Sequence, residues 1–376
     1  MTARTPAPVA VSRVTTLELF FDLVFVFTVT QVTHLVAHAH APFDFLRAFL
    51  LLAVIWWMYG GYAWLTTNLG TSRLEYRLFL LCAMAAYLVI ALRIPAVAGR
   101  HGPALGLAYL VVVLVHLVLF TKVPNSSARA ILSIAPFNLA IALALLATGF
   151  AGGRWSWLLW IAAVLPIVAS TVLRRERGFH LNPAHFAERN GLVVLVALGE
   201  SVVAIGTGAA DLPLGFPVLA AAVLGLALAA GIWWSYFDRD DVRAEHALSG
   251  VAGDERARMG FYAYYHAHLL MIAGIVTAAA GVEQLMAQVG RSGSASAGYL
   301  LSIGIALYLF GEAAFRWLLR IGSPRGRVVA AGVALALIPM GTGLSPLAHL
   351  LLLVALLVAM LVLEARQPEV REDVAR

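Results

Sequence analysis

The chain has 376 residues, of which 61% are hydrophobic and 12% are charged, and its mean hydropathy is +0.87. Soluble globular proteins carry about 25% charged residues, so the composition excludes a soluble enzyme and predicts an all-α protein that crosses a lipid bilayer many times. The net charge of +6 is scattered and forms no basic stripe, the single cysteine Cys82 excludes a disulfide within the chain, and no Gly-Lys-Ser/Thr triplet for a nucleotide is present.

Apolar segments of spanning length follow one another along the whole chain. A spanning helix needs about 20 mostly apolar residues, and twelve segments meet that rule. The predicted spans are 15–39, 44–67, 74–97, 104–122, 128–149, 155–173, 186–208, 214–237, 259–287, 297–319, 326–342 and 345–364. The first is longer than the apolar core of a signal peptide and contains two carboxylates, so we expect it to be retained.

The basic residues predict the orientation of these spans. With the N-terminus in the cytoplasm, 21 of the 26 Lys and Arg residues fall in cytoplasmic segments and five fall on the other side. The five are Arg47, Arg93, Arg100, Arg154 and Arg291. Because cytoplasmic loops are enriched in Lys and Arg, the count favours twelve spans with both termini in the cytoplasm.

A short motif occurs twice and indicates an internal duplication. Ile55-Trp56-Trp57-Met58-Tyr59 in the second span returns as Ile232-Trp233-Trp234-Ser235-Tyr236 in the eighth. The alternative is an aromatic belt at the membrane interface. A duplication divides the chain into parallel six-helix halves at 15–176 and 185–365, with a cytoplasmic linker at 177–184, a disordered tail at 1–14 and a charged tail at 366–376.

Two carboxylates begin the first span. Glu18 and Asp22 are four residues apart and share a helix face, whereas Gln31 points elsewhere. Two like charges at this spacing repel, so we expect one to be protonated, a cation to lie between them, or an arginine to intervene. For Glu18 the alternative is a boundary residue that stabilises the helix N-terminus.

The seventh span carries a second polar set. His185, Glu188 and Arg189 lie on one side of its first turn, and Glu200-Ser201 follows deeper in the helix. Arg189 and Glu200 are about 16 Å apart along the axis and cannot pair. Arg189 is therefore available to Glu18 or Asp22, and Glu200 needs another partner or a protonated, hydrogen-bonded state.

The ninth span offers histidines. Tyr264 and His268 share a face, and we expect a histidine as hydrogen-bond partner of Glu200. His266 and His268 are about 200° apart and cannot chelate one ion from the same face, so we expect no metal and no cofactor.

Two further charged segments have local explanations. Glu312 and Arg316 are four residues apart and should neutralise each other. Asp238-Arg239-Asp240-Asp241 at a helix end is interpreted as a solvated loop and not as a cation site.

Several of these motifs occur together in a known family. They are Thr16-Leu-Glu-Leu-Phe-Phe-Asp-Leu-Val-Phe-Val26, His185-Phe-Ala-Glu-Arg-Asn-Gly191, Leu198-Gly-Glu-Ser-Val202 and His268-Leu269. The chain resembles the bacterial low temperature requirement protein A family over nearly its whole length. The resemblance implies a multi-pass bacterial membrane protein linked to growth in the cold, with His268 at the family histidine and Glu312 where many relatives have a histidine.

The leading functional hypothesis is a secondary transporter in the bacterial cytoplasmic membrane, coupled to protons or cations through Asp22, Glu200 and Glu18. The substrate is an unidentified small molecule or ion, and the expected partners are the lipid bilayer and no nucleic acid. A supporting polar network consists of Arg189, Glu188, His185, Ser201, His268, Tyr264 and Gln31. One alternative is a lipid-modifying enzyme using Ser201, Glu200 and His268, although the glycine pattern of a hydrolase elbow is incomplete. Another is a structural or lipid-sensing protein needed in the cold.

Overall fold

The computed structural model of the protein describes residues 14–69, 73–97, 102–123, 134–151, 156–173, 181–210, 212–289, 295–343 and 345–366. Within these ranges the secondary structure is helical, without a strand, which confirms the all-α class. The two predicted tails lie almost wholly outside the described residues, as does the first half of the linker at 177–184. The second half of that segment leads into α8, which begins at Pro183.

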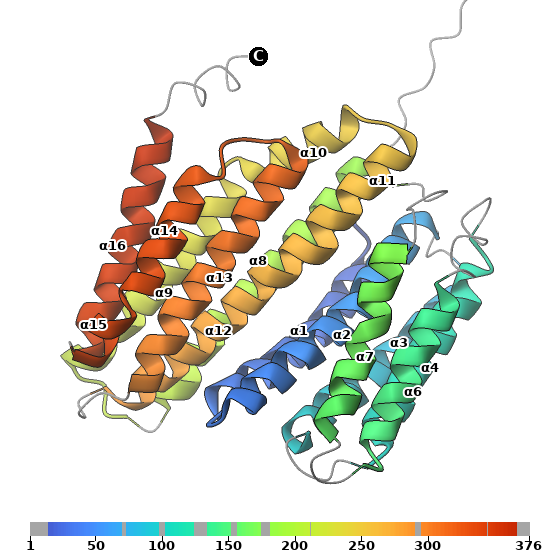
Figure 1. Ribbon diagram of the computed structural model, residues 1–376, viewed down its shortest axis with the longest axis horizontal. Coiled ribbons are helices and arrows are strands. Elements are labelled where there is room, and N and C mark those ends of the chain that lie inside the picture. The colour runs from blue at the N-terminus through green and yellow to red at the C-terminus, as the bar shows by residue number, and fades with distance from the viewer. Residues whose placement is uncertain are drawn as a thin grey trace, which may run out of the picture.

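The first half of the chain forms one group of helices, drawn blue to green in Figure 1. It consists of α1 (Thr16–Ala37), α2 (Pro42–Asn68), α3 (Leu74–Arg93) with the 3₁₀ turn η1 (Ile94–Ala96), α4 (Ala104–Phe120), α6 (Ala135–Thr148) and α7 (Ser156–Leu173). A capping box begins α1, because the Thr15 hydroxyl accepts from the Glu18 amide and the Glu18 carboxylate accepts from the Thr15 amide.

The second half forms the other group, drawn light green to red in Figure 1. It consists of α8 (Pro183–Ala209), α9 (Phe216–Phe237), α10 (Asp240–Ser249), α11 (Gly253–Phe261), the π-helical turn η3 (Tyr262–Ala267), α12 (His268–Ala287), α13 (Ala295–Leu319), α14 (Arg325–Ala336), α15 (Ile338–Gly343) and α16 (Pro346–Ala365).

Eight helices among the described residues are long and apolar enough to cross a membrane. They are Thr16–Ala37, Pro42–Asn68, Leu74–Ala96, Pro183–Ala209, Phe216–Ser249, Gly253–Ala287, Ala297–Leu319 and Pro346–Ala365. Three more apolar helices are shorter, Ala104–Phe120, Ala135–Thr148 and Trp157–Val172. The eleventh predicted span is interrupted between α14 and α15, beside Pro339, which has no amide proton to continue a helical ladder.

The two groups share one order of helix neighbours. In the first, α1 packs on α2 and α3, α3 on α4, α4 on α6, α6 on α7, and α7 on α2. In the second, α8 packs on α9 and α12, α12 on α13, α13 on α14, α14 on α16, and α16 on α9. Each helix of the first group thus has a counterpart with the corresponding neighbours in the second.

The groups meet where α1 and α2 pack against α8 and α12. Within the second group, α12 and α13 pack closely along their length, because glycines allow the backbones to approach. A Cβ atom on Gly274 would collide with the backbone of Tyr308, and one on Gly304 with the backbone of Ala278. Small residues serve this purpose in membrane helix packing.

Candidate functional site

A buried cluster of charges joins the two groups at the start of α1 and α8. Arg189 Nη1 donates to Glu18 Oε1 at 2.7 Å, and Arg189 Nη2 donates to Asp22 Oδ1 at 3.3 Å. Arg189 is 0% exposed, and each carboxylate residue is 2% exposed. The prediction that Arg189 pairs with Glu18 or Asp22 is therefore confirmed. The guanidinium contacts both carboxylates and relieves the repulsion between them.

Hydroxyl and imidazole groups complete this cluster. Tyr59 on α2 donates its hydroxyl proton to Asp22 Oδ1 at 2.6 Å, and Thr66 accepts from Arg189. His185 Nε2 lies 3.6 Å from Glu18 Oε2, and its Nδ1 lies 3.0 Å from the Thr67 hydroxyl. Among the described residues, Asp22 Oδ2 and Arg189 Nε are buried without a hydrogen-bond partner.

Glu18 combines the two roles proposed for it. Its Oε1 accepts from Arg189, while its Oε2 accepts from the amide of Thr15 at 2.8 Å. The residue is at once a helix cap and an ion-pair partner. Asp22 has no capping role and contacts Arg189 and Tyr59.

Two residues expected in this network do not join it. Glu188 is exposed, since the helix turns its side chain away from the interface that buries Arg189. Gln31 is partly exposed and makes no hydrogen bond to the described part of the chain.

Glu200 is buried on α8, 2% exposed, and contacts α1. Thr30 donates its hydroxyl proton to Glu200 Oε2 at 2.5 Å. The prediction that a histidine of the ninth span binds Glu200 is wrong, because His268 Nε2 lies 3.2 Å from the Tyr236 hydroxyl and His268 Nδ1 lies 3.2 Å from the Ala263 carbonyl oxygen.

Glu200 and His268 do not meet because they lie at different heights along the axis of α12. His34, one turn beyond Thr30 on α1, contacts Glu283 near the end of α12. Glu283 is 15 residues beyond His268, about 22 Å along the axis. Glu200 therefore lies near the opposite end of α12 from His268. The ring of His268 packs on Tyr264 at a centroid distance of 4.7 Å, as their shared face predicts. Ser201 is buried but bonds to neither Glu200 nor His268.

A second charged cluster lies within the second group, and it corrects two local interpretations. Glu312 Oε2 accepts from Arg327 Nη1 at 2.7 Å, and not from Arg316. Arg316 instead donates to Asp240 Oδ2 at 2.5 Å and to Glu364 Oε1 at 3.2 Å. Asp240 is 0% exposed, so the interpretation of its segment as a solvated loop is wrong for this residue. Tertiary contacts with α10, α14 and α16 replace the local pair.

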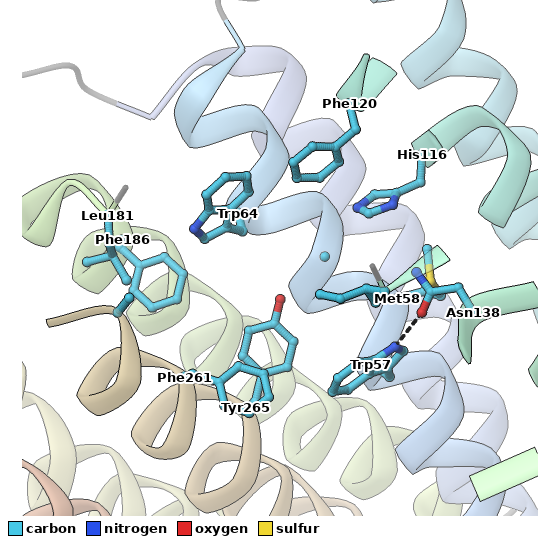
Figure 2. Close-up of a pocket in the computed structure, with 13 residues that line it drawn as sticks. Trp57, Met58, Trp64, His116, Phe120, Asn138, Leu181, Phe186, Phe261 and Tyr265 are labelled. Atoms are coloured by element: carbon cyan, nitrogen blue, oxygen red, sulfur yellow. Dashed lines mark hydrogen bonds between the residues drawn. The ribbon is translucent and has the colours of Figure 1, made fainter. Parts of the chain in front are cut away.

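A cavity of about 60 Å³ lies where α2 and α4 face α11 and η3 (Figure 2). Its aromatic lining consists of Trp57, Trp64, Phe120, Phe186, Phe261 and Tyr265. Two polar groups reach it. Asn138 accepts from Trp57 Nε1 at 2.8 Å, and both ring nitrogens of His116 are buried without a hydrogen-bond partner among the described residues.

Sequence reasoning missed this cavity, although it noted several of the residues. His116 and Asn138 are polar residues inside apolar segments, and Trp57 belongs to the repeated motif. Their convergence on the start of α8 and on η3 depends on contacts between the two groups. No spacing within the sequence reveals those contacts.

A sequence profile of the family described as bacterial low temperature requirement A protein (LtrA) matches residues 13–362. The chain belongs to the LtrA family. One relative, named "Uncharacterized protein RA0937" of Rhizobium meliloti (strain 1021), is 25% identical over 322 residues, which cover 81% of this chain and 77% of the relative. In this LtrA protein the motif residues Glu18, Asp22, Arg189 and Glu200 lie at the interface between α1 and α8. The protein is a bacterial membrane protein with many helices.

Proposed function

We propose that this LtrA-family protein is a proton-coupled secondary transporter of the bacterial cytoplasmic membrane. The proposal rests on where the cavity and the buried carboxylates lie in the fold. The aromatic cavity and the buried carboxylates Asp22 and Glu200 all lie on helices that join the two groups. Secondary transporters bind substrate between two repeated halves that move against each other.

The helix neighbours support the proposed duplication. The same order of packing in the two groups is what two six-helix repeats produce, and it pairs α1 with α8 and α2 with α9. The repeated motif sits at equivalent places in α2 and α9. In each copy the tyrosine bonds to a buried polar group, Tyr59 to Asp22 and Tyr236 to His268. Twelve spans with both termini in the cytoplasm complete this topology.

We choose the proton-binding residues by the hydrogen-bond partners of each buried carboxylate. Glu200 accepts a hydrogen bond from a neutral hydroxyl, and Asp22 keeps one buried oxygen, Oδ2, without a donor. Glu200 can therefore take up a proton without breaking an ion pair. Asp22 has an oxygen without a donor for the proton, and its protonation weakens the pair with Arg189. Glu18, which both caps its helix and pairs with Arg189, acts chiefly as an anchor between the groups.

The cavity indicates the class of substrate. Six aromatic side chains face a small space with one imidazole and one amide. Aromatic faces bind apolar rings and organic cations, so we propose a small organic molecule or cation as substrate. The cavity of about 60 Å³ is smaller than the roughly 150 Å³ that hold a benzene ring, so the two groups must move apart to admit it.

Reconstitution into liposomes with a pH-sensitive dye inside tests the coupling. We expect proton flux down an imposed gradient for the wild type, and flux at the level of empty liposomes for Glu200→Gln and Asp22→Asn. Glu188→Gln, which removes an exposed carboxylate from the same helix as Glu200, should keep the wild-type flux. No flux in the wild type, or equal flux in all four proteins, would contradict the proposal.

A structural or lipid-sensing role is the second candidate, favoured by the paired state of Glu18. It requires Asp22→Asn and Glu200→Gln to support growth in the cold as the wild type does, whereas the transporter requires both to fail. Lipid chemistry at Ser201 has no geometric support, since His268 bonds to Tyr236. Labelling of Ser201 by a fluorophosphonate would restore that alternative.

A further inference from the structure

Two histidines at the end of α1 converge on a glutamate of α12. His34 and His38 are one turn apart and share a face of α1. His34 Nδ1 lies 3.1 Å from Glu283 Oε1. One ligand atom from each of these three residues lies within 4.8 Å of the other two. None of the three residues lines the aromatic cavity.

The hydrogen bond of His38 leaves one ring nitrogen free. His38 Nδ1 lies 2.9 Å from the carbonyl oxygen of His34, so a proton on Nδ1 is donated to the backbone. Nε2 then carries the lone pair. A hydrogen bond from the other ring nitrogen to a backbone carbonyl is the arrangement that orients histidine ligands in metal sites.

The carboxylate contributes an independent observation. The side chain of Glu283 is 10% exposed, and its Oε2 is buried without a hydrogen-bond partner among the described residues. A buried carboxylate oxygen without a donor is costly, and a bound cation supplies the missing partner.

We propose that His34, His38 and Glu283 bind one divalent transition-metal ion of the zinc class. Two imidazoles and one carboxylate suit zinc or cobalt better than magnesium or calcium, which prefer oxygen ligands. Ligand atoms about 2.0 Å from a tetrahedral ion are about 3.3 Å apart, close to the 3.1 Å between His34 Nδ1 and Glu283 Oε1. His38 is exposed, so a small rotation of its side chain can bring Nε2 to the ion.

The site has an open position and a route for the ion. Three protein ligands leave a fourth position of a tetrahedral ion to water, and the His34 side chain is 33% exposed. Because His34 and His38 belong to the first group and Glu283 to the second, the ion links the two groups at the end of α1 remote from Arg189. The inference does not depend on the transport proposal.

Binding is tested on detergent-purified protein without a histidine tag. Co²⁺ is added as a spectroscopic probe, and Zn²⁺ is used to displace it. We expect one equivalent of Co²⁺ with the visible absorption of a tetrahedral site, displaced by Zn²⁺. His38→Ala and Glu283→Gln should weaken the affinity by a factor of at least about 10–100, the loss that follows removal of a residue that only hydrogen-bonds to a ligand. Zn²⁺ should raise the unfolding temperature of the wild type and of neither variant.

His40→Ala is the matched control, because His40 is an exposed histidine two residues beyond His38 and outside the cluster. It should bind Co²⁺ as the wild type does. Equal affinity of His38→Ala and the wild type, or no tetrahedral Co²⁺ signal in the wild type, overturns the proposal and leaves His34–Glu283 as a simple hydrogen bond. If Glu283→Gln fails to fold, His38→Ala decides the matter, because His38 lies on the surface.

Discussion

Arg189 Nη1 lies 2.7 Å from Glu18 Oε1, although 171 positions separate the two residues in the chain. This contact, the Thr30–Glu200 bond and the His34–Glu283 contact fasten α1 to the second group at three levels. Helix α1 is thus the first element of one group and the polar partner of the other. Its contacts determine several measurable properties.

Removal of Arg189 should destabilise the protein strongly. Arg189→Gln leaves Glu18 and Asp22 buried without a cation, and the loss of one member of a buried ion pair costs about 3–5 kcal/mol. The free energy of unfolding, measured by titration with SDS and followed by circular dichroism, should fall by this amount. Arg73→Gln is the control, because the Arg73–Glu75 pair is exposed and should contribute less than about 1 kcal/mol. Equal losses in both variants would contradict the buried cluster.

The Tyr59 hydroxyl should matter more than a hydroxyl bonded to a neutral group. Tyr59 donates to the Asp22 carboxylate, and Tyr62, one turn further on α2, donates to the Val112 carbonyl oxygen at 2.8 Å. Tyr59→Phe should cost about 2 kcal/mol and Tyr62→Phe about 1 kcal/mol in the same assay. Equal costs in the two variants would show that Asp22 is uncharged in the folded protein.

The α12–α13 contact should tolerate no added methyl group. A Cβ on Gly274 meets the backbone of α13, so Gly274→Ala should lower the free energy of unfolding by about 1–3 kcal/mol, the cost of overpacking. A Cβ on Gly332 of α14 meets open space. Gly332→Ala should therefore leave stability unchanged or raise it by up to about 1 kcal/mol. Thermal unfolding of both variants in detergent measures the difference.

The fold class followed from composition, and the positions of the eight long apolar helices followed from apolar length. These properties are local, since a bilayer requires about 20 apolar residues whatever surrounds them. Pairing between helices is a tertiary property, and it was predicted for Arg189 because the seventh span offered one cation and the first span two anions. The predicted histidine partner of Glu200 was wrong because the sequence does not show which residues of neighbouring helices lie at the same height.

Glu312 is a second case in which a tertiary contact overrides a prediction made from spacing within one helix. Its spacing from Arg316 predicted a local pair, but Arg327 from α14 occupies that place, and Arg316 turns to Asp240 and Glu364. A helical i, i+4 pair contributes only about 0.2–0.5 kcal/mol, so a better-placed cation on another helix displaces it.

The Glu312–Arg327 pair allows a test by double substitution. Arg327→Leu leaves Glu312, whose Oε1 already lacks a partner, as an unpaired buried charge, with an expected loss of about 3–5 kcal/mol. Adding Glu312→Leu should restore much of this loss, because apolar pairs replace buried ion pairs at low cost. Additive losses in the unfolding assay would show that the two residues do not interact.

The long stretch of sequence between Glu18 and Arg189 has a consequence for synthesis and membrane insertion of the chain. Ribosomes add about 5–20 residues per second, so the 171 residues from Glu18 to Arg189 take roughly 10–30 s to synthesise. During that interval Arg189 has not been synthesised, so neither carboxylate has its cation. Tyr59 on the next helix is the earliest partner to arrive. The newly made first helix must therefore be kept at the bilayer surface, shielded by the insertion machinery, or protonated until α8 emerges.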